Sequence, residues 1–196
     1  MEQVLNFLDS INPLEDGLRS FLKNNLRKST PQKGAILLQE GTVARHINFI
    51  EKGIIRAFRS GNNDKERTTW FMMENDVFIS IRSFLKQMPA KETIETLEPC
   101  LLYGLTFPLL QEALRRYPSF HFHRAEILEK YYLLNEERED MRQEANKFDA
   151  FCYLMENYPK LVGRVQDKYL ASFINVRPSY FSELKDKYLE QKKNKP

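Results

Sequence analysis

The spacing of hydrophobic residues changes twice along the chain. Within residues 4–26 they recur every three or four positions, which is typical of amphipathic helices, and Asn12-Pro13 interrupts the series. This pattern predicts two short helices. Within residues 33–106 the pattern changes to short runs rich in Ile, Phe, Thr and Leu, separated by turn sequences such as Lys52-Gly53.

These short runs predict six β-strands, at residues 35–39, 46–51, 54–59, 67–73, 91–97 and 100–106. Such regular spacing indicates an antiparallel sandwich or barrel. Gly53 can take the positive φ of a two-residue turn, so we expect a hairpin at Lys52-Gly53. Residues 81–86, inside the same region, predict one short helix.

Helical spacing returns after Thr106. It predicts helices at residues 108–116, 120–144 and 146–158, and the second contains no Gly or Pro. One face of this long helix carries Arg124, Ile127, Tyr131, Leu134, Arg138 and Met141, beside Leu128 and Tyr132. The strand-rich region can cover part of so wide a face. The rest either packs on the same helix of a second subunit, through Ile127, Leu128, Tyr131 and Leu134, or caps its own domain.

Two helices joined by a tight turn are predicted near the C-terminus. Residues 165–174 form the first, and Asn175 tolerates the positive φ that ends a helix better than most residues do. Pro178 suits the first turn of the second helix. This is the spacing of a helix-turn-helix.

A helix-turn-helix places its second helix in the major groove of DNA, and flanking cations contact phosphates. The expected DNA-contacting residues are Lys168, Arg177, Ser179, Tyr180, Ser182, Glu183, Lys185 and Lys187. Glu183 is unusual at such a position. Its carboxylate is repelled by phosphates, although it can accept a hydrogen bond from cytosine N4.

The distribution of charge favours a polyanion as the partner of this C-terminal region. The formal net charge is only +3, but residues 160–196 hold nine Lys or Arg against four Asp or Glu. A basic module on a slightly acidic body suits nucleic acid. Part of that charge belongs to the last six residues, which are expected to be a solvated tail.

Metal-binding and catalytic sites are not expected, and neither is a cofactor. His121 and His123 are two positions apart, so on one helix they point in nearly opposite directions. Cys100 and Cys152 are isolated and are expected to be reduced thiols. Apolar runs fall short of the roughly 18 residues that cross a bilayer, and the N-terminus lacks the features of a secretory signal, which predicts a cytoplasmic protein.

Taken together, the chain resembles the Crp/Fnr family of bacterial transcription regulators, and most closely their Bacteroidetes-type branch. The resemblance is carried by QEGTVARHINFIEKGIIRAF (residues 39–58) and RVQDKYLASFINVRPSYFSELKDK (residues 164–187). It implies an α+β chain with a cyclic-nucleotide-binding-like, double-stranded β-roll in residues 1–117. It further implies a dimerisation helix in residues 118–144, and a winged helix-turn-helix in residues 145–196 that reads a palindromic operator as a homodimer.

The sequence departs from this family at the segment that holds a cyclic nucleotide. In the family a Gly-Glu pair and an Arg bind the ribose and the phosphate, whereas the matching positions here are Ile79, Ser80 and Ala90. The effector pocket implied by the resemblance consists of Ile79, Ser80, Arg82, Ala90, Lys91 and Tyr131. Because a buried phosphate needs a compensating cation, we expect no cyclic AMP binding unless Arg82 or Lys91 substitutes for the missing Arg. If neither residue substitutes for the Arg, the pocket either binds another, less anionic ligand or is vestigial.

Two hypotheses about function remain at this point. The first is a homodimeric regulator of transcription that binds double-stranded DNA and senses a small effector or none. The second is an effector-binding or protein-interaction module of similar shape that has lost DNA recognition. The basic C-terminal region favours the first, and Glu183 leaves the second open.

Overall fold

The computed structural model describes residues 1–61 and 65–193. They form two compact units, the first made of Met1–Arg59 and Trp70–Tyr131, the second of Ser60–Thr69 and Tyr132–Pro196. The long helix α5 (Phe120–Gln143) and the strand β5 (Glu66–Met72) contribute residues to both. The domain boundaries expected at residues 117 and 144 stay a prediction.

The first unit begins with the two predicted helices, α1 (Glu2–Ile11) and α2 (Asp16–Asn25). Asn12 ends α1 in an extended conformation, with φ −157° and ψ 135°, because the following Pro13 disfavours helical dihedrals at that position. The helices bury the apolar faces that the spacing predicted, with Leu5 and Leu18 fully enclosed.

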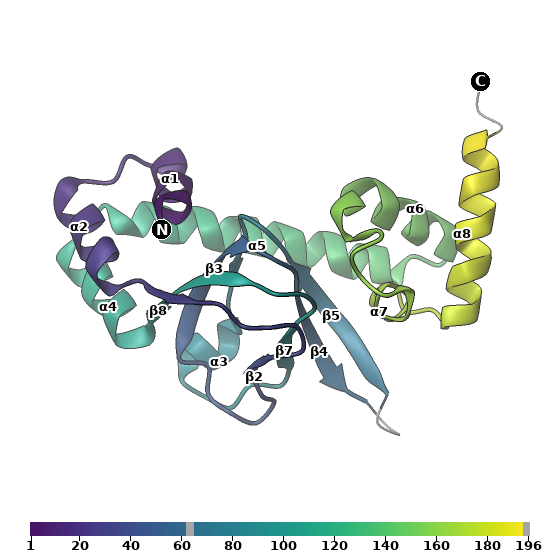
Figure 1. Ribbon diagram of the computed structural model, residues 1–196, viewed down its shortest axis with the longest axis horizontal. Helices are drawn as coiled ribbons and strands as arrows, with labels where there is room; N and C mark the ends of the chain where they lie inside the picture. Colours follow the sequence, from purple (N-terminus) through teal and green to yellow (C-terminus); the bar gives the residue numbers. More distant parts are fainter. Residues whose placement is uncertain (62–64, 194–196) are drawn as a thin grey trace. The chain divides into compact units, whose positions relative to one another are not determined.

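Eight strands form two four-stranded sheets, and every pairing described is antiparallel (Figure 1). One sheet has the order β1 (Arg27–Ser29), β8 (Leu101–Thr106), β3 (His46–Lys52), β6 (Val77–Phe78). The other has the order β2 (Ile36–Leu38), β7 (Thr93–Thr96), β4 (Ile55–Ser60), β5. The predicted α+β fold with an antiparallel roll is confirmed.

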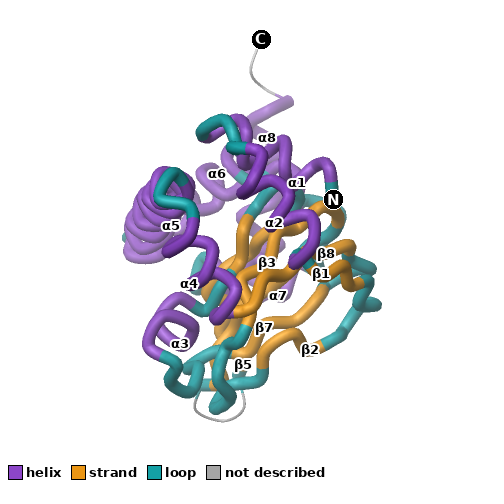
Figure 2. Tube along the Cα trace, turned by 90° about the vertical axis from the view of Figure 1, so that its left-hand side faces the viewer, coloured by secondary structure: helices purple, strands orange, loops and turns teal. Residues whose placement is uncertain are grey.

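All six predicted strands are present, and two short ones escaped prediction. The strand β1 has three exposed residues, and β6 has only two residues, so neither carries an alternating pattern. Figure 2 shows the strands of the first unit in orange, with the purple helices α1, α2 and α4 beside them.

The predicted hairpin at Lys52-Gly53 is wrong. The strands β3 and β4 that flank this turn belong to different sheets, so the turn carries the chain from one sheet to the other. Gly53 does have the expected positive φ, 107°, and it also lies against Cys100. A Cβ at position 53 would be 2.5 Å from the Sγ atom of Cys100, so packing and conformation both require glycine there.

Helix α3 (Ile81–Lys86) has the predicted bounds, and α4 (Phe107–Arg116) begins one residue before the predicted start. Thr106 caps α4, because its hydroxyl accepts a hydrogen bond from the Leu109 N–H at 3.4 Å. The helices α1, α2 and α4 pack on one face of the β1-containing sheet in a core that includes Leu22, Phe49 and Leu105.

The second unit contains α6 (Lys147–Asn157), the short 3₁₀ helix η2 (Pro159–Leu161), α7 (Asp167–Phe173) and α8 (Pro178–Lys193). Phe151 and Phe181 are fully buried at its centre, with ring centroids 5.0 Å apart. The start of β5 joins this unit, because Ser172 accepts a hydrogen bond from the Thr68 N–H at 2.9 Å and donates one to the Glu66 carbonyl at 3.1 Å. Within the described residues after β8 there is no strand, so the predicted wing is not seen.

Candidate functional site

A cavity of about 350 Å³ lies inside the roll. Residues of both sheets line it, together with the loop between β2 and β3. Its polar lining residues are Ser29, Gln39, Thr42, Arg45, His46, Asn48 and Ser80. The cavity is of the size that small-molecule sites in proteins commonly have.

Of the six residues predicted for an effector pocket, two line this cavity. They are Ile79 and Ser80, both buried, at the start of α3. Ala90 is buried but does not line the cavity. Its carbonyl accepts a hydrogen bond from the Gly41 N–H at 2.9 Å, and its N–H donates to the Thr42 carbonyl at 2.8 Å.

The two basic residues named as possible replacements for the missing Arg do not line the roll cavity. Arg82 and Lys91 are exposed and lie outside its lining. Arg82 follows the N-terminal end of the short helix α3, and Lys91 follows the buried Ala90 just before β7. Neither residue lines the roll cavity, which agrees with the expectation that the family's Arg has no replacement in this segment. That expectation stays a prediction.

Sequence reasoning missed Arg45 and His46, which are the basic residues of the lining. His46 and Asn48 alternate with Ile47 and Phe49 along β3, and residues two apart in a strand point to the same face. That alternation was the available signal. The lining includes no Asp or Glu, so the cavity favours a neutral or anionic ligand.

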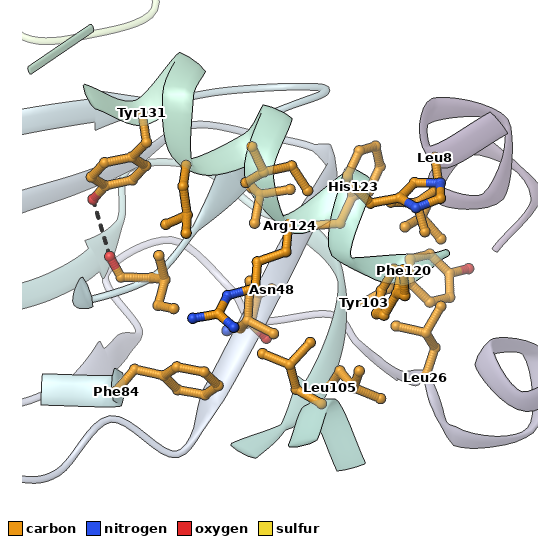
Figure 3. Close-up of a pocket in the computed structure, with 18 of the residues that line it drawn as sticks. Leu8, Leu26, Asn48, Phe84, Tyr103, Leu105, Phe120, His123, Arg124 and Tyr131 are labelled. Carbon is orange, nitrogen blue, oxygen red and sulfur yellow. Dashed lines mark hydrogen bonds between the residues drawn. The ribbon is translucent and has the colours of Figure 1, made fainter. Parts of the chain in front are cut away.

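A second cavity, of about 100 Å³, lies between α5 and the β3-containing sheet (Figure 3). Its lining is almost wholly apolar and includes residues of α1, α2, α4 and the first half of α5. Asn48 and Ile79 line both cavities. Asn48 lies over Gly104 of β8, and a Cβ at position 104 would be 2.5 Å from the Asn48 Oδ1 atom.

Tyr131 lines this second cavity rather than the roll cavity. Its hydroxyl donates a hydrogen bond to the Ile79 carbonyl at 3.1 Å, drawn as a dashed line in Figure 3. Its ring lies 4.1 Å from that of Trp70, between centroids. Tyr131, which was predicted for the effector pocket, therefore contacts the roll cavity only indirectly, through its hydrogen bond to Ile79.

Asp76 lies shortly before Ile79 and is the acidic group of this segment. Burial raises the pKa of its carboxyl above the usual 3.8, an effect that the Met73 N–H and Lys130 oppose. The Met73 N–H donates to Asp76 at 3.0 Å, and the Lys130 ammonium lies 3.7 Å away.

The predicted dimerisation residues lie partly in the first unit's own core. Ile127 and Tyr131 pack against that core, Leu128 lines the second cavity, and Leu134 is half-buried. The apolar side chains of α5 that are exposed are Phe122, Tyr132 and Leu133, at 66%, 62% and 59%. Phe122 and Leu133 lie on the side of α5 opposite the buried residues, and Tyr132 lies at the edge next to Leu128.

The turn between α7 and α8 has the geometry that Asn175 was predicted to allow. Asn175 has φ 59°. The Val176 N–H donates to the Ala171 carbonyl at 2.9 Å, and the Asn175 N–H donates to the Ser172 carbonyl at 3.3 Å. These two bonds form a Schellman motif, which normally places glycine at the position of Asn175.

Seven of the eight predicted DNA-contacting residues are exposed, namely Lys168, Arg177, Ser179, Tyr180, Ser182, Glu183 and Lys187. The eighth, Lys185, is half-buried and pairs with Asp167 of α7 at 2.9 Å. Lys187 lies over the ring of Phe148, 4.1 Å from its centroid. Around the middle of α8 the outermost face, opposite Phe181, carries Glu183 and Asp186, and Lys187 lies on the flank.

His123 is fully buried, and its Nε2 atom lies 2.9 Å from the Asn12 carbonyl oxygen. Within the described ranges, no group of three or more His, Cys, Asp or Glu is arranged to hold a metal ion. No helix in the described part of the chain is long and apolar enough to cross a membrane.

Residues 30–117 match the family model of the cyclic nucleotide-binding domain. Among solved structures, the c-di-GMP responsive global regulator CLP of Xanthomonas campestris is 12% identical, over 90% of this chain and 93% of that chain, with a TM-score of 0.70. FixK2 of Bradyrhizobium japonicum is 10% identical over 85% of each chain, with a TM-score of 0.73. A protein of Eubacterium rectale described as a transcriptional regulator of the Crp/Fnr family is 12% identical, over 95% of this chain and 88% of that chain, with a TM-score of 0.71.

A comparison with curated proteins found no match. The strand-rich part of the chain is similar to domains of the cyclic nucleotide-binding type, over a match of less than half of the chain. The three solved structures show that its fold is shared with bacterial regulators.

Proposed function

We propose that this chain is a homodimeric transcription regulator, rather than an enzyme, and that it binds double-stranded DNA through α7 and α8. The observation that carries the proposal is the Schellman turn at Asn175, with the exposed first turn of α8 directly after it. A cyclic nucleotide-binding-type domain followed by these helices supports the same conclusion.

Charged residues on α7, on the turn and on α8 define how these helices would contact DNA. Lys168, Arg177 and Lys187 are exposed and supply contacts to phosphates. Ser179 and Ser182 can donate to or accept from base edges, and Glu183 accepts from the N4 amine of cytosine. Recognition would then depend on an operator with cytosine opposite Glu183.

Dimerisation would use the exposed side of α5, which differs from the side predicted from sequence. Phe122 and Leu133 are about three helical turns apart on that side, with Tyr132 beside Leu133. Large exposed apolar side chains on one helix face are typical of a contact surface. The effector pocket of such a regulator would be the roll cavity, with Arg45, His46 and Ser80 as its polar groups.

A second function is favoured by the acidic outer face of α8. Glu183 and Asp186 point away from the buried Phe181, where a DNA-binding helix usually presents basic or neutral groups. A module that uses this helix to bind a protein, and not DNA, would have the same fold.

Gel-shift titration with random-sequence DNA distinguishes the two functions. The wild-type chain should bind at about 50 mM salt and weaken steeply as the salt concentration rises, because phosphate contacts release counterions. Glu183→Arg should tighten this nonspecific binding by about tenfold, since it replaces a repelled carboxylate with a cation.

Glu156→Arg is the matched control. It makes the same change of charge at an exposed position of α6 and should shift affinity by less than about threefold. Absence of wild-type binding at low salt, or equal effects of the two substitutions, would contradict DNA binding by α8.

A further inference from the structure

The cavity beneath α5 combines apolar walls with one cationic side chain. Its walls include Leu22, Leu26, Leu105, Leu110 and Phe120, and its lining contains no Asp or Glu. Arg124 lines it as well, and Figure 3 shows the Arg124 side chain extending from α5 across the cavity toward Asn48. Arg124 is exposed, so its guanidinium lies where the cavity meets solvent.

Arg124 has no ion pair or hydrogen bond within the described part of the chain. A guanidinium prefers a carboxylate or phosphate partner, and bonds between charged partners are stronger than neutral ones. Lys130, further along α5, by contrast pairs with Asp76. Arg124 is therefore available to an anion from outside the chain.

Asn48 supplies a second polar group beside the same cavity. It is half-buried, it lines the cavity, and its amide has no hydrogen bond among the described residues. An amide N–H can donate to one oxygen of a carboxylate while the guanidinium binds the other. Both groups thus fit the head of one small acid.

The size of the cavity limits the apolar part of such a ligand. At about 100 Å³ it is somewhat smaller than an engineered apolar cavity of about 150 Å³ that takes benzene. A body of about four or five carbon atoms is the upper limit that fits without movement of the walls.

We propose that this cavity binds a small carboxylic acid with an apolar body, its carboxylate on Arg124 and Asn48 and its body among Leu105, Leu110 and Phe120. The site is separate from the roll cavity, and the proposal does not depend on DNA binding.

Calorimetry on the full chain with hexanoate and pentanoate tests the proposal. Both should bind with dissociation constants of about 1 mM or tighter. Arg124→Gln should weaken hexanoate at least about tenfold but change hexan-1-ol less than about twofold, because only the acid uses the guanidinium. Arg115→Gln, at an exposed position of α4, is the matched control and should change neither.

Two further variants distinguish binding in this cavity from binding elsewhere on the chain. Leu128→Trp fills the cavity from its half-buried edge and should abolish binding of acid and alcohol alike. Arg45→Gln changes the roll cavity and should leave hexanoate unaffected. Loss of hexanoate binding in Arg45→Gln, equal binding in Arg124→Gln and wild type, or no binding to the wild-type chain would overturn the proposal.

Discussion

The turn at Asn175 and the segment containing Ile79, Ser80 and Ala90 both carry residues that differ from the Crp/Fnr pattern. At the turn, the property required is a positive φ, and Asn175 provides it while both capping hydrogen bonds form. In the segment, the backbone also takes the expected course, since α3 has its predicted bounds. The property required for a cyclic nucleotide is charge, however, and all three replacements are uncharged.

The difference separates two kinds of substitution. A residue that only has to adopt a conformation can be exchanged for another that tolerates it, and the fold is preserved. A residue that has to neutralise a buried anion cannot be exchanged for an apolar one without changing which ligand binds. Backbone similarity to a family therefore indicates fold more safely than it indicates ligand.

Gly53 gives the strongest test of a position that requires a particular backbone conformation. Gly53→Ala should lower the free energy of unfolding by about 3 kcal/mol, because the new Cβ meets Cys100 in a strained backbone conformation. Urea titration measures the change. Gly41→Ala is the control: Gly41 also has a positive φ, but its surroundings are open, so only the smaller backbone strain applies.

Asn175 should show a smaller effect of the same origin. Asn175→Val should cost about 1–2 kcal/mol, because a β-branched residue is disfavoured at a φ of 59°. Asn175→Gly should be neutral or slightly stabilising. Thermal unfolding compares the two variants, and a tolerated Val would show that the turn does not depend on its conformation.

Asp76 tests what a buried charge contributes next to the altered segment. Its pKa is raised above 3.8 by burial, so the carboxyl contributes stability below that pH and loses it as the pH rises through the folded-state pKa. In Asp76→Asn this loss is absent. Relative to wild type, the variant should therefore gain stability between pH about 3.5 and about 7 in urea unfolding, and a constant difference would contradict the assignment.

The smallest expected effect is a null result with cyclic nucleotides. Calorimetry with cyclic AMP and cyclic GMP at about 1 mM should show no heat of binding, because no cation of the segment reaches the roll cavity. Binding in the micromolar range would mean that Arg45 or His46 replaces the missing Arg. The segment around Ile79 would then have kept its ligand, just as the turn at Asn175 has kept its conformation.

Sequence periodicity was sufficient for most of the fold. The strands β3 and β8 and the helix α3 follow directly from spacing and turn residues. The Lys52-Gly53 turn was assigned wrongly, because a turn sequence specifies local dihedrals and not which sheet the next strand joins.

Less of the candidate site was predictable. Arg45 lies outside any strand, and its place in the cavity lining depends on how the loop after Gly41 folds back. The periodicity of α5 identified an apolar face but not its partner. Ile127 and Tyr131 pack in their own unit, and this left Phe122 and Leu133 exposed instead.

Asn48 gives the two cavities a thermodynamic relationship. Its side chain forms part of both walls, and Gly104 leaves it the room to lie there. A ligand that reorients this amide in one cavity alters the surface offered to a ligand in the other. Such coupling is reciprocal, so each ligand would change the affinity of the other by the same factor. Through the Asn48 amide, the first unit would then respond to two ligands together differently from either ligand alone.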